Sequence, residues 1–449
     1  MFNPNHIAEF VSKKFQKFGI NKNREVSRLV YEIAKRDNIL PSQVLLQVCS
    51  QKFEGVKNEL LKLRYPQNYG VVKTEEFYLP KLDISESAEV KICPSMPVPE
   101  KIYYEKGLQE SQQLTNARRA YPNATIEEIS SLKEFAKNCN HSFEKYNQRA
   151  KSLFLVTEKY DFFKPCPCTK DALCCGYEIL NIGFGCAFEC SYCFLQEYQN
   201  FPGIILPLNL QDHLPAISKT AFTGSIFGKR RVGSGQFTDS LIFDHITGFS
   251  KAITEYFYKI PDTYFEFKTK SANIANLLEC KASKNVVASW SLNPQNLIDE
   301  NEFYTASLQQ RLEAAKACAK AGYSVGFHFD PVIKYANWQT DYKEVIEQIA
   351  ATVPVESVLW LSVGTLRMTP QLKKAIENRF PQNKILDEEL LLGYDGKLRY
   401  SRSVREDIYK NFGSWCAQYL PKTYTYLCME EKSVWDKTGY EYKLSQQSS

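Results

Sequence analysis

The feature that most constrains the fold is a regular alternation of strand-like and helix-like segments that begins near residue 176. Short apolar segments alternate with longer segments of helical periodicity, which is typical of βα units. Six such units in succession predict an α/β chain that folds as a partial, open (β/α)6 barrel, with its site at the C-terminal ends of the strands. The predicted strands lie near residues 177–184, 230–237, 263–269, 286–292, 323–329 and 356–363, and the predicted helices between them include 245–258, 307–321 and 341–352.

Ahead of this region the chain has a different character. The N-terminal residues have helical periodicity, with Val26 on the apolar face and Asn21 or Asn23 as possible caps, and a second helix is expected to open at Pro41. Two short helices with a tight connection could form a helix-turn-helix for DNA or pack as a small domain. The predicted division is a helical extension at 1–70, a linker at 71–100, an α/β segment at 101–175 (strand 101–104, helices 108–119 and 126–137), the barrel at 176–425 and a C-terminal tail at 426–449.

Three cysteines follow the first predicted barrel strand: Cys186, Cys190 and Cys193, at C-x3-C-x2-C spacing. Three thiolates can hold three irons of a four-iron, four-sulfur cluster, whereas a closed ferredoxin-type site uses four. The remaining iron can bind S-adenosylmethionine (SAM), which can then be cleaved reductively to a 5′-deoxyadenosyl radical. A structural zinc site would need a fourth ligand nearby, but the next His and Cys are His213 and Cys280.

A second group of cysteines precedes the same strand: Cys166, Cys168, Cys174 and Cys175. A strand of about seven residues at roughly 3.3 Å each separates the two groups by about 20 Å. The second group is therefore not expected to bind the same cluster. It could hold a separate metal, or it could pack at the lower end of the barrel, because free cysteines are commonly buried.

Composition narrows the class of protein. The 449 residues are 44% hydrophobic and 24% charged, with a formal net charge of +5, as in an ordinary globular protein that can accept a polyanionic partner. Fourteen cysteines are too sparse for a disulfide scaffold, which favours a reducing cytoplasm. The N-terminus lacks the pattern of a signal peptide, and the apolar runs are too short to span a membrane. We therefore expect a cytoplasmic protein without a membrane partner.

The string from Asn181 to Gln196 resembles the cluster motif of the spore photoproduct lyase family, whose radical SAM enzyme repairs a thymine dimer in DNA. The resemblance covers about residues 101–425 and leaves out the N-terminal helices. Further matching positions are Thr238-Asp239, Asp244-His245, Thr269-Lys270, Ser291-Leu292-Asn293, Ala321-Gly322-Tyr323 and Arg379-Phe380-Pro381.

The resemblance implies a radical SAM barrel with one [4Fe-4S] cluster and SAM, and with DNA and an electron donor such as flavodoxin or ferredoxin as partners. It implies Cys186, Cys190 and Cys193 as cluster ligands. It also implies that Thr238, Lys270, Ser291 and Asn293 bind SAM, a role that suits hydroxyls, an amide and an ammonium.

The chain departs from the family at the positions that finish the reaction. The repair enzyme quenches its product radical with a cysteine in the second βα loop, and the alignment on Thr238 places Gln236 there. A tyrosine follows the last cluster cysteine in that enzyme, where this chain has Phe194, although Tyr192 is kept. Another donor could act, such as Cys428 or Cys280, or the reaction could differ. Tyr192, Gln236 and Cys428 are the candidate catalytic positions.

Two basic segments, Lys229–Arg231 and Lys397–Arg402, mix with aromatic residues in a way that suits a phosphate backbone and stacked bases. The interpretation that follows is a radical SAM enzyme of this family, a carbon–carbon lyase that acts on a thymine lesion in DNA. One alternative is a radical SAM enzyme with a non-DNA substrate (a metabolite, peptide or RNA). Another is an iron–sulfur protein that binds DNA through its N-terminal helices.

Overall fold

The computed structural model describes residues 4–139, 142–157, 159, 162–169, 171–197, 202–217, 220, 222 and 224–443. The chain forms two compact units. Unit 1 comprises Met1–Glu89, Ile333–Ala336 and Leu366–Arg405, and unit 2 comprises Val90–Val332, Asn337–Thr365 and Glu406–Ser449. None of the helices in the described ranges is long and apolar enough to cross a membrane.

Unit 2 is built on an eight-stranded sheet with the order β17-β13-β12-β10-β9-β8-β5-β4. All neighbours from β5 to β17 are parallel, and β4 pairs antiparallel with β5 at the edge. The strands are β4 (Phe163–Pro165), β5 (Tyr177–Leu180), β8 (Arg230–Gly233), β9 (Thr263–Thr269), β10 (Val286–Ser291), β12 (Ser324–Val332), β13 (Val358–Thr365) and β17 (Tyr424–Leu427). All six predicted barrel strands are present, in sequence order, and the predicted partial-barrel fold is confirmed.

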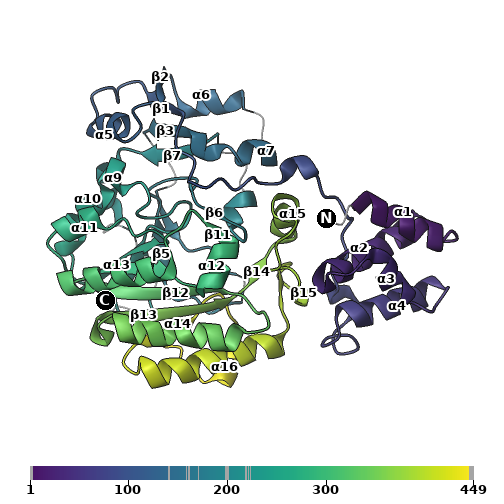
Figure 1. The fold of residues 1–449 in the computed structure, drawn as a ribbon. Coiled ribbons are helices and arrows are strands. Elements are labelled where there is room, and N and C mark those ends of the chain that lie inside the picture. The colour runs from purple at the N-terminus through teal and green to yellow at the C-terminus, as the bar shows by residue number, and fades with distance from the viewer. Residues whose placement is uncertain are drawn as a thin grey trace. The chain divides into compact units, whose positions relative to one another are not determined.

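Helices cover the outside of this sheet (Figure 1), where α10 contacts β9 and β10, and α13 contacts β10 and β12. The longest predicted helices are present, and α13 begins with a capping box in which Ser307 and Gln310 satisfy each other's backbone N–H groups. The helices of this region are α8 (Leu210–Ile217), α9 (Asp244–Thr247), α10 (Phe249–Tyr258), α11 (Ala275–Glu279), α12 (Gln295–Asn301), α13 (Leu308–Ala321), α14 (Trp338–Thr352), α16 (Arg402–Tyr419) and α17 (Lys432–Thr438).

The seventh parallel strand, β17, was not predicted. Its four residues, Tyr424–Leu427, are too few to show a period, and the predicted tail begins within them. Pairing with β13, in which Trp360 lies opposite Tyr424, makes the segment a strand.

The segment before the barrel forms a separate parallel sheet with the order β2-β1-β3-β7. The helix predicted over 126–137 is wrong in its first half, because Thr125-Ile-Glu-Glu-Ile129 alternates as a strand does and pairs with β1. The helical part begins only after the cap Ser131. The elements are β1 (Lys101–Glu105), α5 (Gln112–Ala120), β2 (Thr125–Ile129), α6 (Leu132–Lys137), α7 (Phe143–Tyr146), β3 (Ser152–Val156) and β7 (Ile204–Pro207).

Unit 1 combines the N-terminal helices with a later segment. Its elements are α1 (Pro4–Lys14), α2 (Ile20–Asp37), α3 (Pro41–Leu46), α4 (Phe53–Arg64), α15 (Pro370–Arg379) and a three-stranded sheet of β14 (Arg367–Met368), β16 (Leu398–Tyr400) and β15 (Leu390–Leu392). This division differs from the predicted domains, since residues 366–405 cluster with the helices rather than with the barrel.

The local start of α2 also differs from the prediction. Gly19 is at the N-cap, and Asn21 lies inside the helix. Asn23 is also inside, where its side-chain amide donates to the Phe18 carbonyl at 3.0 Å and so turns back over the first turn. The second helix does open at Pro41, which is at N1, where its missing N–H costs nothing.

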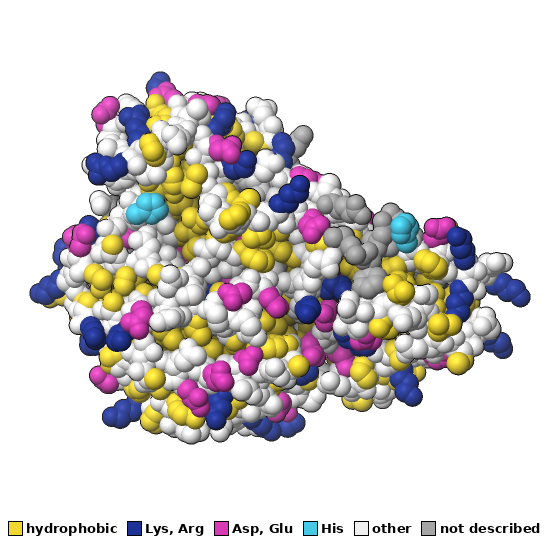
Figure 2. Space-filling model, viewed as in Figure 1, with side chains coloured by type: hydrophobic (Ala, Val, Ile, Leu, Met, Phe, Trp, Pro, Cys, Tyr) yellow, Lys and Arg dark blue, Asp and Glu magenta, His cyan; other side chains and the backbone are white. Residues whose placement is uncertain are grey.

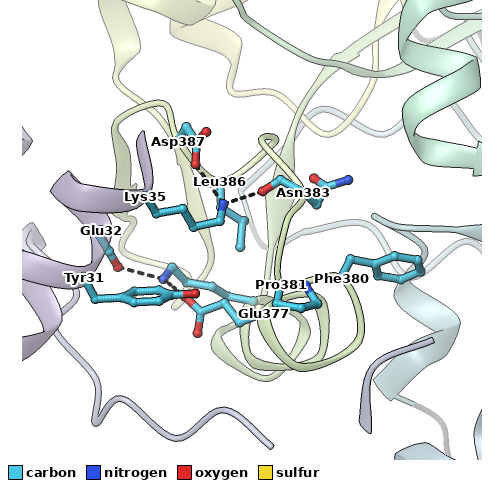
Figure 3. Close-up of a pocket in the computed structure, with 10 residues that line it drawn as sticks. Tyr31, Glu32, Lys35, Glu377, Phe380, Pro381, Asn383, Leu386 and Asp387 are labelled. Carbon is cyan, nitrogen blue, oxygen red and sulfur yellow. Dashed lines mark hydrogen bonds and ion pairs between the residues drawn. The ribbon is translucent and has the colours of Figure 1, made fainter. Parts of the chain in front are cut away.

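A buried ion network stabilises unit 1, and Figure 3 shows two of its members, Glu32 and Glu377. Glu32 on α2 contacts Arg64 on α4 and Lys373 on α15, with N–O distances of 2.8 and 3.0 Å. Glu377 on α15 contacts Arg28 on α2 at 2.7 Å. The cavity beside this network has a volume of about 20 Å³, which leaves room for little more than a water molecule. The cluster is therefore structural rather than a ligand site.

Candidate active site

The predicted cluster cysteines lie on the segment that joins the two sheets of unit 2. After β5 the chain passes through the motif and then enters the second sheet as β7, and a bridge between Phe184 and Ile205 fixes the entry. Gly185 has a φ of +83°, and a Cβ there would lie 3.1 Å from the Gly203 carbonyl oxygen. A glycine is therefore needed directly before Cys186.

Two short elements shape the rest of the motif. Glu189 and Cys190 form the two-residue strand β6, which pairs antiparallel with β11 (Glu302–Phe303). Phe194–Glu197 form a 3-10 turn directly after Cys193. The cysteine segment is thus held by backbone hydrogen bonds to a loop more than one hundred residues away.

The three thiols lie in an apolar environment. Cys190 is buried, and Cys186 and Cys193 pack against an aromatic cluster that includes Phe184 and Phe237. Burial raises the pKa of Cys186 to about 12 and also raises the pKa of Cys190 and Cys193. Burial therefore favours the neutral thiol form of all three cysteines, and binding a metal would require that their protons be released.

No three His, Cys, Asp or Glu side chains in the described ranges converge on a point as they would around one metal ion. A four-iron cluster binds each cysteine through a different iron, so its ligands are spread around the cluster. The number and spacing of the three thiols are those that a four-iron cluster with one open iron would need.

Two polar oxygen atoms just after β8, one on Thr238 and one on Gln236, have no hydrogen-bond partner among the described residues. Thr238 is 8% exposed, and its Oγ1 atom is buried with no hydrogen-bond partner among the described residues. The same holds for Oε1 of the half-buried Gln236. A Cβ at Gly183 would lie 3.1 Å from the Thr238 methyl group, so Gly183 allows Thr238 to approach the first strand. A buried hydroxyl without a partner is costly unless a ligand satisfies it.

Asp239 connects the ends of β8 and β9. Its carboxylate accepts hydrogen bonds from the Thr269 hydroxyl at 2.6 Å and from the Lys270 backbone N–H at 2.7 Å. Burial raises the pKa of Asp239 despite these bonds. The two residue pairs that match the family, Thr238-Asp239 and Thr269-Lys270, thus lie in contact at the C-terminal edge of the barrel.

Glu302 on β11 organises a second corner, and the sequence analysis did not identify it. The carboxylate accepts hydrogen bonds from the Tyr192 hydroxyl, from Asn293 Nδ2 at 2.8 Å and from Arg311 Nη2 at 2.6 Å. Burial alone would raise its pKa, but Arg311 and Lys270 outweigh it and lower the pKa of Glu302 to about 2. Glu302 is therefore ionised and fixes the residues around it.

Glu302 interacts with two of the residues predicted to bind SAM, Lys270 and Asn293. Lys270 Nζ lies 5.5 Å from the Tyr192 ring centre. Burial would lower the pKa of Lys270, but the Glu302 carboxylate outweighs burial and raises it, so Lys270 remains an ammonium. Asn293 is engaged on both sides, because its Oδ1 accepts from the Tyr342 hydroxyl at 2.7 Å. Its side chain supports Tyr192 and Glu302.

The remaining candidate positions are less closely grouped. Ser291 is buried at the end of β10, and its carbonyl accepts from Arg311 at 2.8 Å. Phe194 is 39% exposed, with its ring centre 6.4 Å from that of Phe237. Cys428 follows β17, and its backbone N–H donates to the Val363 carbonyl at 2.8 Å. Cys280 ends α11, where its thiol lies 3.2 Å from the Asn276 carbonyl.

The second cysteine group lies at the start of β5, where the Cys166 backbone N–H donates to the Tyr177 carbonyl. Cys168 and Cys174 have their sulfurs 3.5 Å apart, and Cys175 lies 3.8 Å from Arg231 Nη1. The group thus lies at the opposite end of β5 from Cys186.

The prediction that Lys229–Arg231 faces a phosphate backbone is wrong for its two arginines. Arg230 is buried and binds Glu178 through two bonds of 2.6 and 2.8 Å. Arg231 is buried inside the barrel and contacts Glu266 at 2.6 Å. In the second basic segment Arg399 is buried against Asp395. Figure 2 shows acidic and basic side chains intermixed over the face in view, without a large basic surface.

The parallel partial barrel, with a three-cysteine segment at the C-terminal edge of its first strand, defines the class of a radical SAM enzyme. Residues 97–426 match the sequence model of the family described as spore photoproduct lyase. The chain belongs to the spore photoproduct lyase family, and the predicted lyase class is confirmed.

Related proteins and solved structures agree with this assignment. The spore photoproduct lyase of Clostridium acetobutylicum is 30% identical over 232 residues, which are 50% of this chain and 67% of that protein. The Bacillus subtilis enzyme is 29% identical over 215 residues, and these cover 46% of this chain and less than two thirds (61%) of that protein.

Among solved structures, a spore photoproduct lyase complexed with dinucleoside spore photoproduct has a TM-score of 0.62 at 22% identity, over 74% of this chain and 99% of that chain. A variant with bound AdoMet and the same dinucleoside has a TM-score of 0.61 at 21% identity, over 75% and 100%. At this level of identity the match establishes the fold.

Proposed function

We propose that this chain is a radical SAM lyase that binds a [4Fe-4S] cluster through Cys186, Cys190 and Cys193 and acts on a thymine-type lesion in DNA. When bound, the cluster and SAM supply a 5′-deoxyadenosyl radical, which abstracts a hydrogen atom from the substrate. The observation that carries the cofactor proposal is the buried Thr238 hydroxyl, which has no partner among the described residues and lies at the strand edge that is followed by the three-cysteine segment.

The side chains around the cysteines have separate tasks. Thr238 offers a hydroxyl, and the buried Lys270 ammonium can meet the carboxylate of SAM. Ser291 is the third proposed SAM contact. Asn293 and Tyr192 are tied to Glu302, so we propose that they shape the wall of the SAM site rather than exchange partners during the reaction.

The substrate proposal rests on family membership and on the lesion that the solved relative contains. The position that should return a hydrogen atom to the product radical holds Gln236, whose N–H and C–H bonds are much stronger than an S–H bond. Phe194 lacks a phenolic hydrogen. Tyr192 keeps its hydroxyl, but that hydroxyl donates to Glu302. The hydrogen donor must therefore be another group, with Cys428 as one candidate, or an external thiol.

These two departures favour a second candidate function, a radical SAM lyase with a different substrate. Anaerobically reconstituted protein, reductant and SAM should yield 5′-deoxyadenosine, and no yield with any substrate would refute the radical chemistry. Dinucleoside spore photoproduct should then be converted to thymidine. Formation of 5′-deoxyadenosine without thymidine would leave the class intact and favour the other substrate.

The substitution Gln236→Cys tests the mapped position with Gln236→Ser as its matched control. Cysteine adds a weak S–H bond at the same place and should increase thymidine formation, whereas serine should not. An equal effect of both substitutions would show that Gln236 is not at the hydrogen-donor position.

The third possibility, DNA binding through the N-terminal helices, has less support. The helix that would have to read the groove, α3, has six residues, and Val44 and Leu45 are buried in the core of unit 1. We therefore propose that these helices have a packing role.

A further inference from the structure

Arg149 is a fully enclosed arginine that no sequence motif singled out. It lies in a single turn just before β3 and is 5% exposed. Its guanidinium group is also stacked on an aromatic side chain, with Cζ 4.2 Å from the Tyr146 ring centre. A buried guanidinium ion has lost its hydration, so its hydrogen bonds and ion pair must compensate for that loss.

Those contacts converge on the cysteine segment. Nε donates to the Cys186 carbonyl at 2.9 Å, and Nη2 donates to the Phe188 carbonyl at 2.6 Å. Nη1 donates to the Glu189 carboxylate at 2.8 Å and to the Tyr146 carbonyl at 3.1 Å. The Arg149 side chain thus binds Cys186, Phe188 and Glu189, which are three of the first four residues of the C-x3-C segment.

The chemistry requires arginine. A guanidinium group carries five N–H donors in a rigid plane. The four hydrogen bonds of Arg149 use all three of its nitrogen atoms. A lysine would keep the charge but has a single point of attachment and could not hold the two carbonyls and the carboxylate together.

We infer that Arg149 is a positioning residue that presets the Cys186–Cys190 turn for cluster assembly. The inference rests on the proposed function, since it concerns the same cysteines. Carbonyl oxygens of the turn are fixed toward Arg149, so the backbone that carries the two thiols is ordered before any iron arrives. Preorganised ligands lose less conformational freedom when a metal binds.

The test is the substitution Arg149→Lys, with Arg230→Lys as its matched control. Arg230 is also a buried arginine that binds one carboxylate, Glu178, and two backbone carbonyls, but at the start of β8. Both variants should lower the melting temperature of the iron-free protein. After anaerobic reconstitution, Arg149→Lys should retain less than one third of the wild-type iron and sulfide per chain, and Arg230→Lys should retain the wild-type amount.

Iodoacetamide labelling of the iron-free protein provides a readout that does not depend on the cluster. Cys186 should react at least threefold faster in Arg149→Lys than in the wild type or in Arg230→Lys, because the turn opens. Glu189→Gln keeps the two carbonyl bonds of Arg149 but leaves this arginine buried without its carboxylate. It should therefore lower the melting temperature, yet it should retain more iron and sulfide than Arg149→Lys.

The outcomes separate the two levels of inference. Wild-type protein that assembles no cluster would refute the proposed function. A wild-type protein that assembles a cluster, with Arg149→Lys equal to it in iron content and labelling, would overturn the role of Arg149. Equal iron loss in Arg149→Lys and Glu189→Gln would also overturn it, because the ion pair rather than the grip on the carbonyls would then matter.

Discussion

Replacing Glu32 with glutamine should destabilise unit 1 strongly, because Glu32 holds three cations that have almost no access to water. The Glu32 carboxylate lies 2.8 Å from Arg64, 3.0 Å from Lys373 and 3.5 Å from Arg28, and the exposed fractions of these three side chains are 2%, 6% and 1%. In Glu32→Gln, one carboxylate, Glu377, remains among them. Removing one partner of a buried ion pair costs about 3–5 kcal/mol.

The matched control is Glu25→Gln, the same chemical change on the same helix. Glu25 lies 2.7 Å from Lys57, but the two side chains are 31% and 21% exposed. Pairs with this access to water contribute about 1 kcal/mol or less. The two variants therefore differ in the burial of the ion pair.

The assay is hydrogen exchange of the backbone amides of α2 and α4. A loss of about 3 kcal/mol corresponds to a loss of protection of roughly a hundredfold. Glu25→Gln should change protection by less than about tenfold. Equal loss in the two variants would refute the argument that burial makes the Glu32 network valuable.

The effect should also depend on pH. Burial by itself would raise the pKa of Glu32, but Lys373, Arg64 and Arg28 outweigh it and hold the pKa well below its ordinary value of 4.5. Since the folded-state pKa is depressed, the stabilisation is complete above about pH 4.5 and is lost as the pH falls below that value. The difference between wild type and Glu32→Gln should narrow in acid, and a constant difference from pH 7 to pH 3 would contradict this cause.

Three further predictions concern unit 2. Thr238→Val should weaken SAM binding at least tenfold in equilibrium dialysis while leaving the melting temperature within two degrees of wild type, because it removes a hydroxyl that has no protein partner among the described residues. Cys190→Ala should abolish assembly of the four-iron cluster, as read by its visible absorbance. Glu302→Gln should lower the stability of unit 2 by about 3 kcal/mol, since it leaves Arg311 buried without its carboxylate. Urea denaturation followed by tryptophan fluorescence measures this stability, because all five tryptophans lie in unit 2. Glu300→Gln, on the exposed face of α12, is the control.

Local patterns explain why much of the barrel could be predicted. A parallel strand is a short apolar run, and an amphipathic helix repeats about every 3.6 residues, so both can be recognised within a few residues of chain. The helix at Leu308–Ala321 shows this, since its periodicity and its capping residues Ser307 and Gln310 are adjacent in sequence. The segment Tyr424–Leu427 was too short for either pattern to appear.

Charged residues illustrate the opposite case. Arg230 and Arg231 have the composition of a nucleic-acid-binding segment, yet each is buried against an acidic partner, Glu178 52 residues earlier and Glu266 35 residues later. Nothing in the local sequence distinguishes a buried arginine from an exposed one. The partner is brought in by the sheet, and its contribution depends on the exclusion of water.

The sequence by itself determined the class of this protein, through the number and spacing of its three cysteines and the partial barrel that carries them, and it also contains the residues Phe194 and Gln236. These depend on residue type and on short spacing along the chain. Only the tertiary structure decided how that segment is held, with Arg149 gripping it from one side and Glu302 fixing Tyr192 across 110 residues of chain. The physical reason is that two residues far apart in the sequence can form a hydrogen bond only if packing brings their backbone segments together. The spacing of residues along the chain does not reveal this.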